Sequence, residues 1–168
     1  MLFLESIKYE IDNHRVISFD IFDTLLLRPY VKPTDLFLHI EKLTNRVNFS
    51  DRRIKAEQKA RQTHKEQEDI TLDDIYNEID DNYKDLKQLE IDLETQILQQ
   101  NKEMFEVFEY AKQQGKKVII TSDMYLDKNI LVNILNLKGY KDYYKLYVSS
   151  DIKKAKATGN LYKYIIEI

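Results

Sequence analysis

Three polar residues that can act on phosphorus each follow a short apolar run. Asp20 ends the first run, Ser122 ends the second, and Lys156 lies downstream of the third. A carboxylate can attack phosphorus or bind Mg²⁺, a hydroxyl can donate to an anionic oxygen, and an ammonium group can offset negative charge. Taken together, these residue types indicate chemistry on a phosphoryl group.

Each of these residues also has an ordinary structural use. Asp20 can form a turn that ends a strand, Ser122 can cap a helix, and Lys156 can belong to a solvated surface with the lysines next to it. Thr121 is a second candidate for holding a substrate beside Ser122. The functional interpretation therefore depends on the three segments being brought together.

The apolar runs predict strands over residues 16–22, 117–121 and 145–149. Their nearly continuous apolar character is typical of a parallel sheet covered on both faces. The pattern over 127–137 predicts an amphipathic helix, with Asp127 as its N-cap and Gly139 just past its end. Strand, helix and strand then form one right-handed crossover unit. Parallel strands place their C-terminal ends, and hence the polar residues, at one edge of the sheet.

The middle of the chain follows a helical period. Helices are expected to begin near Thr34 and Ser50, and Thr71 with Asp74 has the form of a capping box for a third. An apolar stripe over 86–97 marks one face of a long helix, which Asn101 is expected to interrupt. We therefore expect a helical block rather than more strands.

This pattern predicts one globular unit with an inserted part. The core comprises 1–31 and 111–168, and the helical insertion comprises 32–110. The insertion leaves the sheet directly after the Asp20 loop, which places it over the C-terminal edge of the strands. It is therefore expected to act as a cap over any site there.

One helix of the insertion is basic through Arg52, Arg53, Lys55, Lys59, Arg61 and Lys65. A solvated face with ion pairs to Glu57 and Glu66 is the favoured interpretation. A surface that guides anions to the cleft is the alternative. Nucleic acid binding is disfavoured because no aromatic residues are interleaved with these charges.

Composition narrows the class of protein. The 168 residues carry a net charge of -3, which favours neither nucleic acid nor an anionic membrane surface. The chain has no cysteine, which excludes disulfides, thiolate metal sites and a cysteine nucleophile. Glu5 interrupts the first apolar residues, and no run approaches the length of a membrane span, so a cytoplasmic location is expected.

The three segments together resemble the haloacid dehalogenase-like superfamily. Its members use an Asp after the first strand, a Ser or Thr after the second, and a Lys near the third. The pattern is most similar to a branch of hydrolases associated with bacterial surface-polysaccharide synthesis. The matching pieces are the Phe-Asp-Xaa-Phe-Asp-Thr-Leu of 19–25, the Arg-Xaa-Xaa-Ala-Glu-Xaa-Xaa-Ala-Arg of 53–61, the Ser-Asp-Met-Tyr-Leu of 122–126 and the Lys-Xaa-Xaa-Gly-Xaa-Leu of 156–161.

The resemblance implies an α/β fold with a Rossmann-like, three-layer core, a parallel sheet and an inserted helical cap. It implies that Asp20 is the nucleophile and a ligand to Mg²⁺, with the backbone carbonyl of Phe22 as a second ligand. Ser122 would hold a phosphoryl oxygen, and Lys156 would offset negative charge. The expected substrate is a small phosphorylated compound.

Two features depart from the family pattern. Phosphatases of the superfamily carry an acid two residues after the nucleophile, and here that position is Phe22. Asp23 is the replacement candidate for an acid or base, although strand alternation directs it away from Asp20. The chain also reaches Ile168 without the fourth acidic segment of the family. The first strand is then expected to be an exposed edge, available for self-association or a partner chain.

The sequence therefore predicts a Mg²⁺-dependent hydrolase that acts through Asp20. The alternative is a non-catalytic or truncated relative of these enzymes that binds a phosphorylated ligand or a partner protein. Phe22 and the missing fourth segment favour the alternative, whereas Asp20, Ser122 and Lys156 together favour the enzyme.

Overall fold

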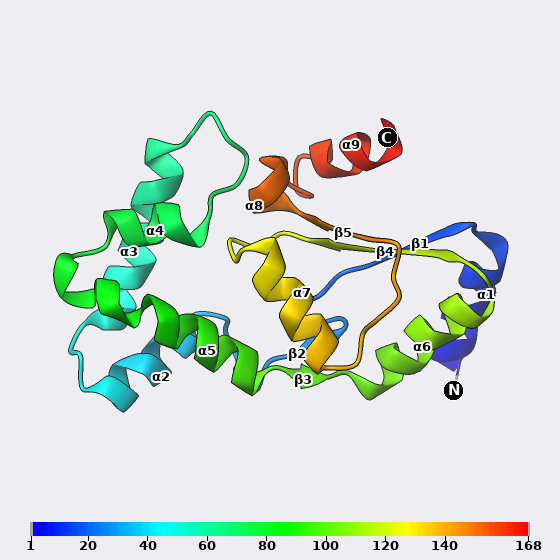
Figure 1. Cartoon of the computed structure of the whole chain (residues 1–168), viewed down its shortest axis with the longest axis horizontal. Helices are drawn as coiled ribbons and strands as arrows, with labels where there is room; N and C mark the ends of the chain where they lie inside the picture. Colours follow the sequence, from blue (N-terminus) through cyan, green and yellow to red (C-terminus); the bar gives the residue numbers. More distant parts are fainter. Residues whose placement is uncertain (1, 168) are drawn as a thin grey trace.

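A computed structural model describes residues 2–167 and shows a mixed α/β fold with a small parallel sheet flanked by helices (Figure 1). The sheet has the strand order β1-β4-β5, so the central strand pairs in parallel with both neighbours. Among the described strands β1 pairs only with β4 in this sheet, which confirms that the strand before Asp20 is an edge. The three strands are β1 (Val16–Phe19), β4 (Lys117–Ser122) and β5 (Lys145–Val148).

Helices connect and cover these strands. Around the sheet lie α1 (Leu2–Asn13), α6 (Lys102–Gln113), α7 (Lys128–Leu137), α8 (Ser149–Ile152) and α9 (Asn160–Glu167). The inserted part contains α2 (Asp35–Thr44), α3 (Phe49–Thr63), α4 (Leu72–Glu78), the 3-10 helix η1 (Asp81–Leu86) and α5 (Lys87–Ile97). Figure 1 shows this second group gathered at one end of the molecule, beyond the ends of the strands.

Side-chain alternation along β4 separates the two faces of the sheet. Ile119 packs on one face with Tyr147 and with Leu161 of α9. Val118 and Ile120 belong to the main core, together with buried residues of α6 and α7. Both faces are therefore covered, which explains why the strand sequence is nearly continuously apolar.

A second, two-stranded pairing marks where the inserted part leaves the core and returns. β2 (Leu26–Leu27) pairs antiparallel with β3 (Gln99–Gln100), with Leu26 opposite Gln100. The short strand β3 falls where only helices were expected. We call residues 28–98 the cap, because they lie between these two strands.

The helix α6 belongs with the sheet rather than with the cap. Phe108 of α6 packs against Phe19 of β1, with ring centroids 5.5 Å apart. Most of α6 falls within 32–110, the range expected for the insertion, and the return to the core comes earlier, at Asn101. Asn101 also caps α6 by accepting a hydrogen bond from Met104, so the expected interruption at this residue is confirmed.

Local capping signals are also confirmed. The Thr71 hydroxyl accepts from the backbone of Asp74 at 3.1 Å, and the Asp74 carboxylate accepts from the Thr71 backbone at 2.8 Å. Asp127 accepts from the Asn129 backbone at 2.7 Å and begins α7. By contrast, the sequence patterns did not predict α1.

The expectation of a solvated basic face on α3 is wrong for Arg53. This side chain has no exposed area, and two of its nitrogens donate to Glu90 of α5 at 2.8 and 2.9 Å. Tyr76 of α4 donates to the same carboxylate at 2.7 Å. Burial by itself disfavours the charge, yet the attraction and hydrogen bonds of Glu90 outweigh it, and the pKa of Arg53 is raised above its usual value.

The small residues of the 53–61 pattern allow this burial. Ala56 and Ala60 lie on the buried side of α3, where larger side chains would keep the helix away from its neighbours. Glu57 and Arg61 follow Arg53 at intervals of one helical turn. Glu57 accepts from Arg53 at 3.2 Å and from Arg61 at 3.0 and 3.2 Å, so the three form one chain of ion pairs.

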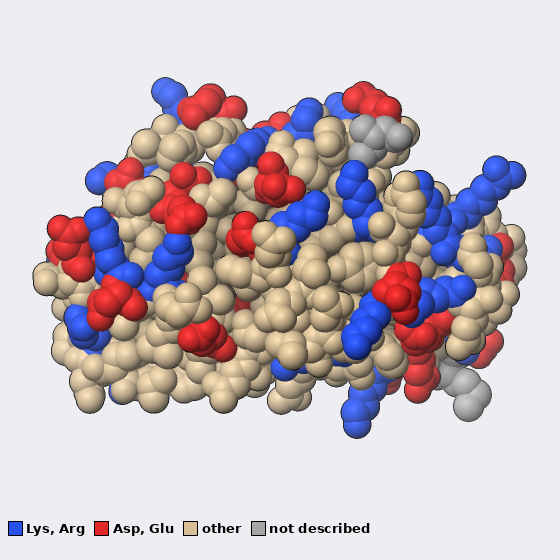
Figure 2. All heavy atoms as spheres, viewed as in Figure 1, with Lys and Arg blue, Asp and Glu red and all other residues tan. Residues whose placement is uncertain are grey.

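The surface shows no region dominated by one sign of charge on the face seen in Figure 2, where basic and acidic side chains are interspersed. This agrees with the small net charge of the sequence. Within residues 2–167, every helix is too short or too polar to cross a membrane.

Replacing Arg53 by alanine should lower the free energy of unfolding by about 3–5 kcal/mol, because the Glu90 carboxylate stays buried without its charged partner. Urea denaturation followed by circular dichroism measures this change. Arg52→Ala, at an exposed position of the same helix, is the matched control and should stay within about 0.5 kcal/mol of the parent. Equal losses in the two variants would contradict the buried network.

Candidate functional site

Lys156 and Asp20 meet at the C-terminal edge of the sheet. The Nζ of Lys156 donates to Oδ1 of Asp20 at 2.8 Å, although the two residues lie 136 positions apart in the chain. The Lys156 side chain is 20% exposed and the Asp20 side chain 39%, so the pair is sheltered but open to a ligand. The first and third sequence segments are therefore brought together as expected.

The segment after β4 positions Lys156 through its backbone. Both carboxylate oxygens of Asp123 accept from the backbone N–H of Lys156, at 2.9 and 3.0 Å. This contact anchors the loop after α8 to the end of β4. Asp123 was not among the residues predicted for the site, although it directly follows Ser122 in the motif that indicated the site.

Ser122 is buried at the end of β4, and its hydroxyl has no hydrogen-bond partner among the described residues. A buried hydroxyl without a partner is uncommon, because losing its contacts with water costs free energy. Its strand neighbours β1, so the hydroxyl lies one strand away from the segment that ends in Asp20. Ser122 lines neither of the two hollows described below at the strand ends, and no hydrogen bond joins it to Asp20 or Lys156.

Thr121 does not share this position. Its hydroxyl is bonded to the hydroxyl of Ser18 on β1 at 2.9 Å. Because side chains alternate along a strand, Thr121 and Ser122 lie on opposite faces of β4. Thr121 thus joins β4 to β1, and its predicted substrate contact stays a prediction.

The loop after Asp20 turns sharply, and Asp23 adopts a left-handed backbone with φ of 57°. The Asp23 side chain is 66% exposed and its carboxylate pairs with Arg28 at 3.3 Å. Arg28 also donates to Glu94 at 3.1 Å and lies over the ring of Phe22, 4.0 Å from its centroid. Asp23 is therefore engaged with Arg28, and its catalytic role stays a prediction.

Two residues that follow the cap in the sequence, Asn101 and Tyr140, hold this loop. Asn101 donates from its side chain to the Thr24 carbonyl and from its backbone to the Leu25 carbonyl, each at 2.9 Å. The Tyr140 hydroxyl donates to the same Leu25 carbonyl at 2.7 Å. These contacts fix the chain just beyond Asp20, and nothing in the local sequence pattern indicated them.

The donor set near Asp20 fits a magnesium ion that is shared with a phosphorylated ligand. Asp20 offers a carboxylate oxygen, and the Phe22 carbonyl accepts no hydrogen bond from any described residue. Over residues 2–167 no three acidic, His or Cys side chains cluster as a metal site. Mg²⁺ commonly binds proteins through one or two carboxylates and takes its other ligands from water and substrate phosphate. One carboxylate and one carbonyl meet that minimum.

A pocket of about 420 Å³ lies between the cap and the strand ends. From the core it is bordered by the residues that follow Asp20, Ser122 and β5, and from the cap by charged residues of α3 and the segment after it. Its lining comprises Phe22, Arg28, Pro33, Glu57, Arg61, Glu68, Asp69, Asp123, Met124, Tyr125, Ala155 and Ala157. The volume suits a small ligand held between both parts.

Asp20 itself borders a different hollow, a mostly apolar groove of about 330 Å³ along the β1 edge. Ile7 and Ile11 of α1 and Met104 of α6 form its walls. The groove lies where self-association or a partner chain was expected, and that interaction stays a prediction. Asp20 therefore sits between the groove and the segments that border the pocket.

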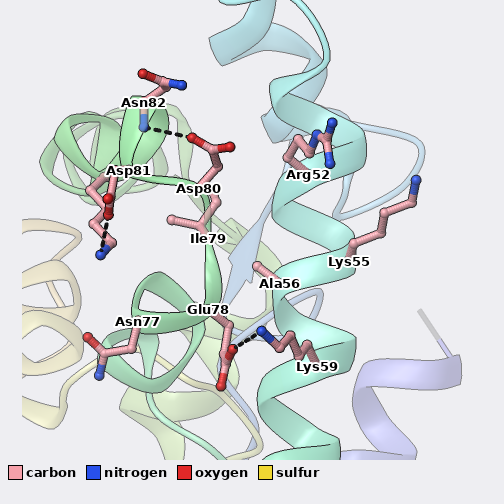
Figure 3. A pocket seen from close by; sticks show the side chains of 11 residues that line it. Arg52, Lys55, Ala56, Lys59, Asn77, Glu78, Ile79, Asp80, Asp81 and Asn82 are labelled. Carbon is pink, nitrogen blue, oxygen red and sulfur yellow. Dashed lines mark hydrogen bonds and ion pairs between the residues drawn. The ribbon is translucent and has the colours of Figure 1, made fainter.

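The largest hollow lies on the outside of the cap, between α3 and residues 77–84 (Figure 3). Four of its charged residues form ion pairs with one another, Lys59 with Glu78 at 2.7 Å and Lys84 with Asp81 at 2.6 Å. It contains none of the candidate catalytic residues, although Arg52, Lys55 and Lys59 of the basic face of α3 line it. We therefore assign the candidate site to the strand ends.

Two acidic cap residues, Glu68 and Asp69, contact the core and were missed by the sequence analysis. Asp69 is buried, accepts from the hydroxyl of Ser149 at the end of β5, and pairs with Arg61 at 2.9 Å. The Ser149 hydroxyl in turn accepts from the Met124 backbone at 3.0 Å. The chain of ion pairs on α3 thus continues to the ends of two strands.

No known family model matches the chain, and no curated protein resembles it at a significant level.

Replacing Ser122 by alanine should leave the free energy of unfolding unchanged or raise it by up to about 1 kcal/mol, because the lost hydroxyl has no partner. Thr121→Val removes the neighbouring hydroxyl at nearly constant shape and should cost about 0.5–1 kcal/mol, since Ser18 loses its partner. Urea denaturation of both variants gives the comparison. A loss in Ser122→Ala as large as that in Thr121→Val would show that the hydroxyl has a structural role.

Proposed function

We propose that the protein is a Mg²⁺-dependent hydrolase of the haloacid dehalogenase type, acting on a small phosphorylated substrate through Asp20. The motifs support this assignment, as does a parallel sheet whose first strand is followed by a helical insertion. In this proposal the sheet and its helices are a Rossmann-like core, and residues 28–98 are its cap. A role in surface-polysaccharide synthesis rests on the resemblance of the motifs.

The contact between Lys156 and Asp20 is the observation that carries the proposal. An ammonium group 2.8 Å from a carboxylate oxygen can be a simple ion pair. Here, however, the pair lies at the C-terminal edge of a parallel sheet, where open α/β folds bind their ligands. It also lies next to a strand whose buried terminal hydroxyl has no partner. The three groups match what transfer of a phosphoryl group requires.

In the proposed reaction an Asp20 oxygen attacks phosphorus in line with the leaving oxygen. The bond from phosphorus to the leaving group breaks, and that group departs with the electron pair. Ser122 donates to a phosphoryl oxygen while Lys156 offsets the negative charge. Water then attacks phosphorus, which releases phosphate and restores the carboxylate. Bound Mg²⁺, held by Asp20 and the Phe22 carbonyl, would supply further positive charge.

The residue at position 22 limits the substrates that this mechanism can process. Phe22 cannot donate a proton, and its ring lies under the Arg28 guanidinium. A leaving group that departs readily as an anion therefore suits the site better than a simple alkoxide. We infer that aryl or acyl phosphates are processed faster than alkyl phosphates.

A binding module is the second candidate function. One observation favours it: Phe22 occupies the position at which phosphatases of the superfamily carry an acid. Such a module would hold a phosphorylated ligand through Ser122 and Lys156 without cleaving it. The two functions differ in turnover, not in their affinity for an anion.

The parent protein should hydrolyse 4-nitrophenyl phosphate when Mg²⁺ is present, because nitrophenolate needs no proton to leave. Asp20→Asn should lower kcat by about 10³-fold or more, because the nucleophile is removed. Release of nitrophenolate measures the rate. Asp151→Asn, an exposed carboxylate that pairs with Lys128 at 3.7 Å, is the matched control and should keep the parent rate.

The same preparations distinguish the second candidate. Orthovanadate binding, followed by calorimetry, should depend on Ser122 and Lys156 under either function. Binding without turnover would favour the module over the enzyme. Turnover that survives in Asp20→Asn would exclude the proposed nucleophile.

A further inference from the structure

Glu68 of the cap binds the loop that carries Lys156. Its Oε2 accepts from the backbone of Ala155 and from the hydroxyl of Thr158, each at 2.7 Å. Its Oε1 accepts from the side-chain amide of Asn160. These three hydrogen bonds, the backbone bond first among them, hold the pKa of Glu68 at about 2, so the carboxylate is charged at neutral pH.

The contacts of Glu68 surround Lys156 on both sides in sequence. Ala155 precedes the lysine directly, and Thr158 follows two positions later. From the core, Asp123 holds the backbone N–H of Lys156 itself. The loop therefore has one anchor in the core and one in the cap, and both are carboxylates that accept backbone hydrogen bonds.

The residue after Glu68 fixes the position of this anchor. Asp69 accepts from Arg61 of α3 and from the hydroxyl of Ser149, which follows β5. Glu68 and Asp69 thus contact two different core segments, the Lys156 loop and the end of β5. A shift of the cap relative to the sheet must break or stretch both sets of contacts.

We propose that Glu68 is a positioning residue that makes the contact between Lys156 and Asp20 depend on the seated cap. This inference rests on the proposed function, in which Lys156 offsets charge on the phosphoryl group. When the cap is seated, Glu68 holds the loop so that the ammonium group reaches Asp20. When the cap lifts, the loop keeps only its Asp123 anchor, and the lysine is freer to leave.

This role has a chemical use. In this proposal the lysine is at its working position only while the cap is seated on the strand ends. Charge stabilisation is then strongest when the substrate is enclosed, since electrostatic contacts weaken in water. An error of about 1 Å in placing such a group can cost about 10²-fold in rate.

Chemical labelling of Lys156 tests the proposal without relying on turnover. The parent and the variants Glu68→Ala and Glu68→Gln are treated with trinitrobenzenesulfonate, and peptide mass spectrometry follows the modification of Lys156. Lys163, an exposed residue of α9, is the internal reference. Glu66→Gln, an exposed carboxylate two positions earlier, is the matched control.

We expect Lys156 to be labelled several-fold faster in Glu68→Ala than in the parent, with the reference lysine unchanged. Glu68→Gln should give an intermediate rate, because an amide keeps one acceptor oxygen. Glu66→Gln should match the parent. Unchanged labelling of Lys156 in folded Glu68→Ala, as judged by circular dichroism, would overturn the proposal. If Glu68→Ala does not fold, the labelling rate of Lys156 in Glu68→Gln is the test, and a rate equal to that of the parent would overturn the proposal.

A double-mutant cycle on hydrolysis then separates positioning from general support of the fold. Glu68→Ala should lower kcat by about tenfold to 10²-fold in the parent and leave KM nearly unchanged. In a Lys156→Ala background it should have almost no effect, because the group that it positions is already gone. Equal losses in both backgrounds would contradict a role through Lys156. If the parent shows no hydrolysis, the proposed function fails while labelling still tests the positioning.

Discussion

Parallel pairing of β4 with β1 on one side and with β5 on the other is the constraint on which the site depends. It forces three loops from distant parts of the sequence to one edge of the sheet. Asp20 follows β1, Ser122 is the last residue of β4, and Lys156 lies beyond β5. The contact between Lys156 and Asp20 follows from this pairing together with the Asp123 anchor.

The cap depends on a different interaction, a chain of buried and half-buried ion pairs. It begins at Glu90, continues along α3 through Arg53, Glu57 and Arg61, and ends at Asp69 beside the strands. Burying charge is costly unless each group is paired, and here every member has a partner. The same residues that order the cap interior thus also set its position on the core.

Local patterns predicted much of the fold, because strand runs and helix caps depend on neighbours in sequence. The Thr71 capping box and the helix after Asp127 are examples. The site at the strand ends was predicted because Asp20 and Ser122 each end an apolar run. The burial of Arg53 and the contacts of Glu68 could not be predicted from local patterns, because their partners Glu90 and Ala155 lie 37 and 87 positions away. A charged residue at helical spacing gives the same sequence pattern whether its side chain faces water or a buried carboxylate.

The most direct test of the central claim is whether the Asp20 carboxylate accepts a phosphoryl group. Fluorine NMR of the protein with beryllium fluoride and Mg²⁺ measures this, because the beryllium fluoride adduct of a carboxylate mimics an aspartyl phosphate. We predict one set of protein-bound fluorine signals, formed at one equivalent, absent in Asp20→Asn and weakened in Ser122→Ala. Bound signals that persist in Asp20→Asn, or none in the parent, would contradict the account.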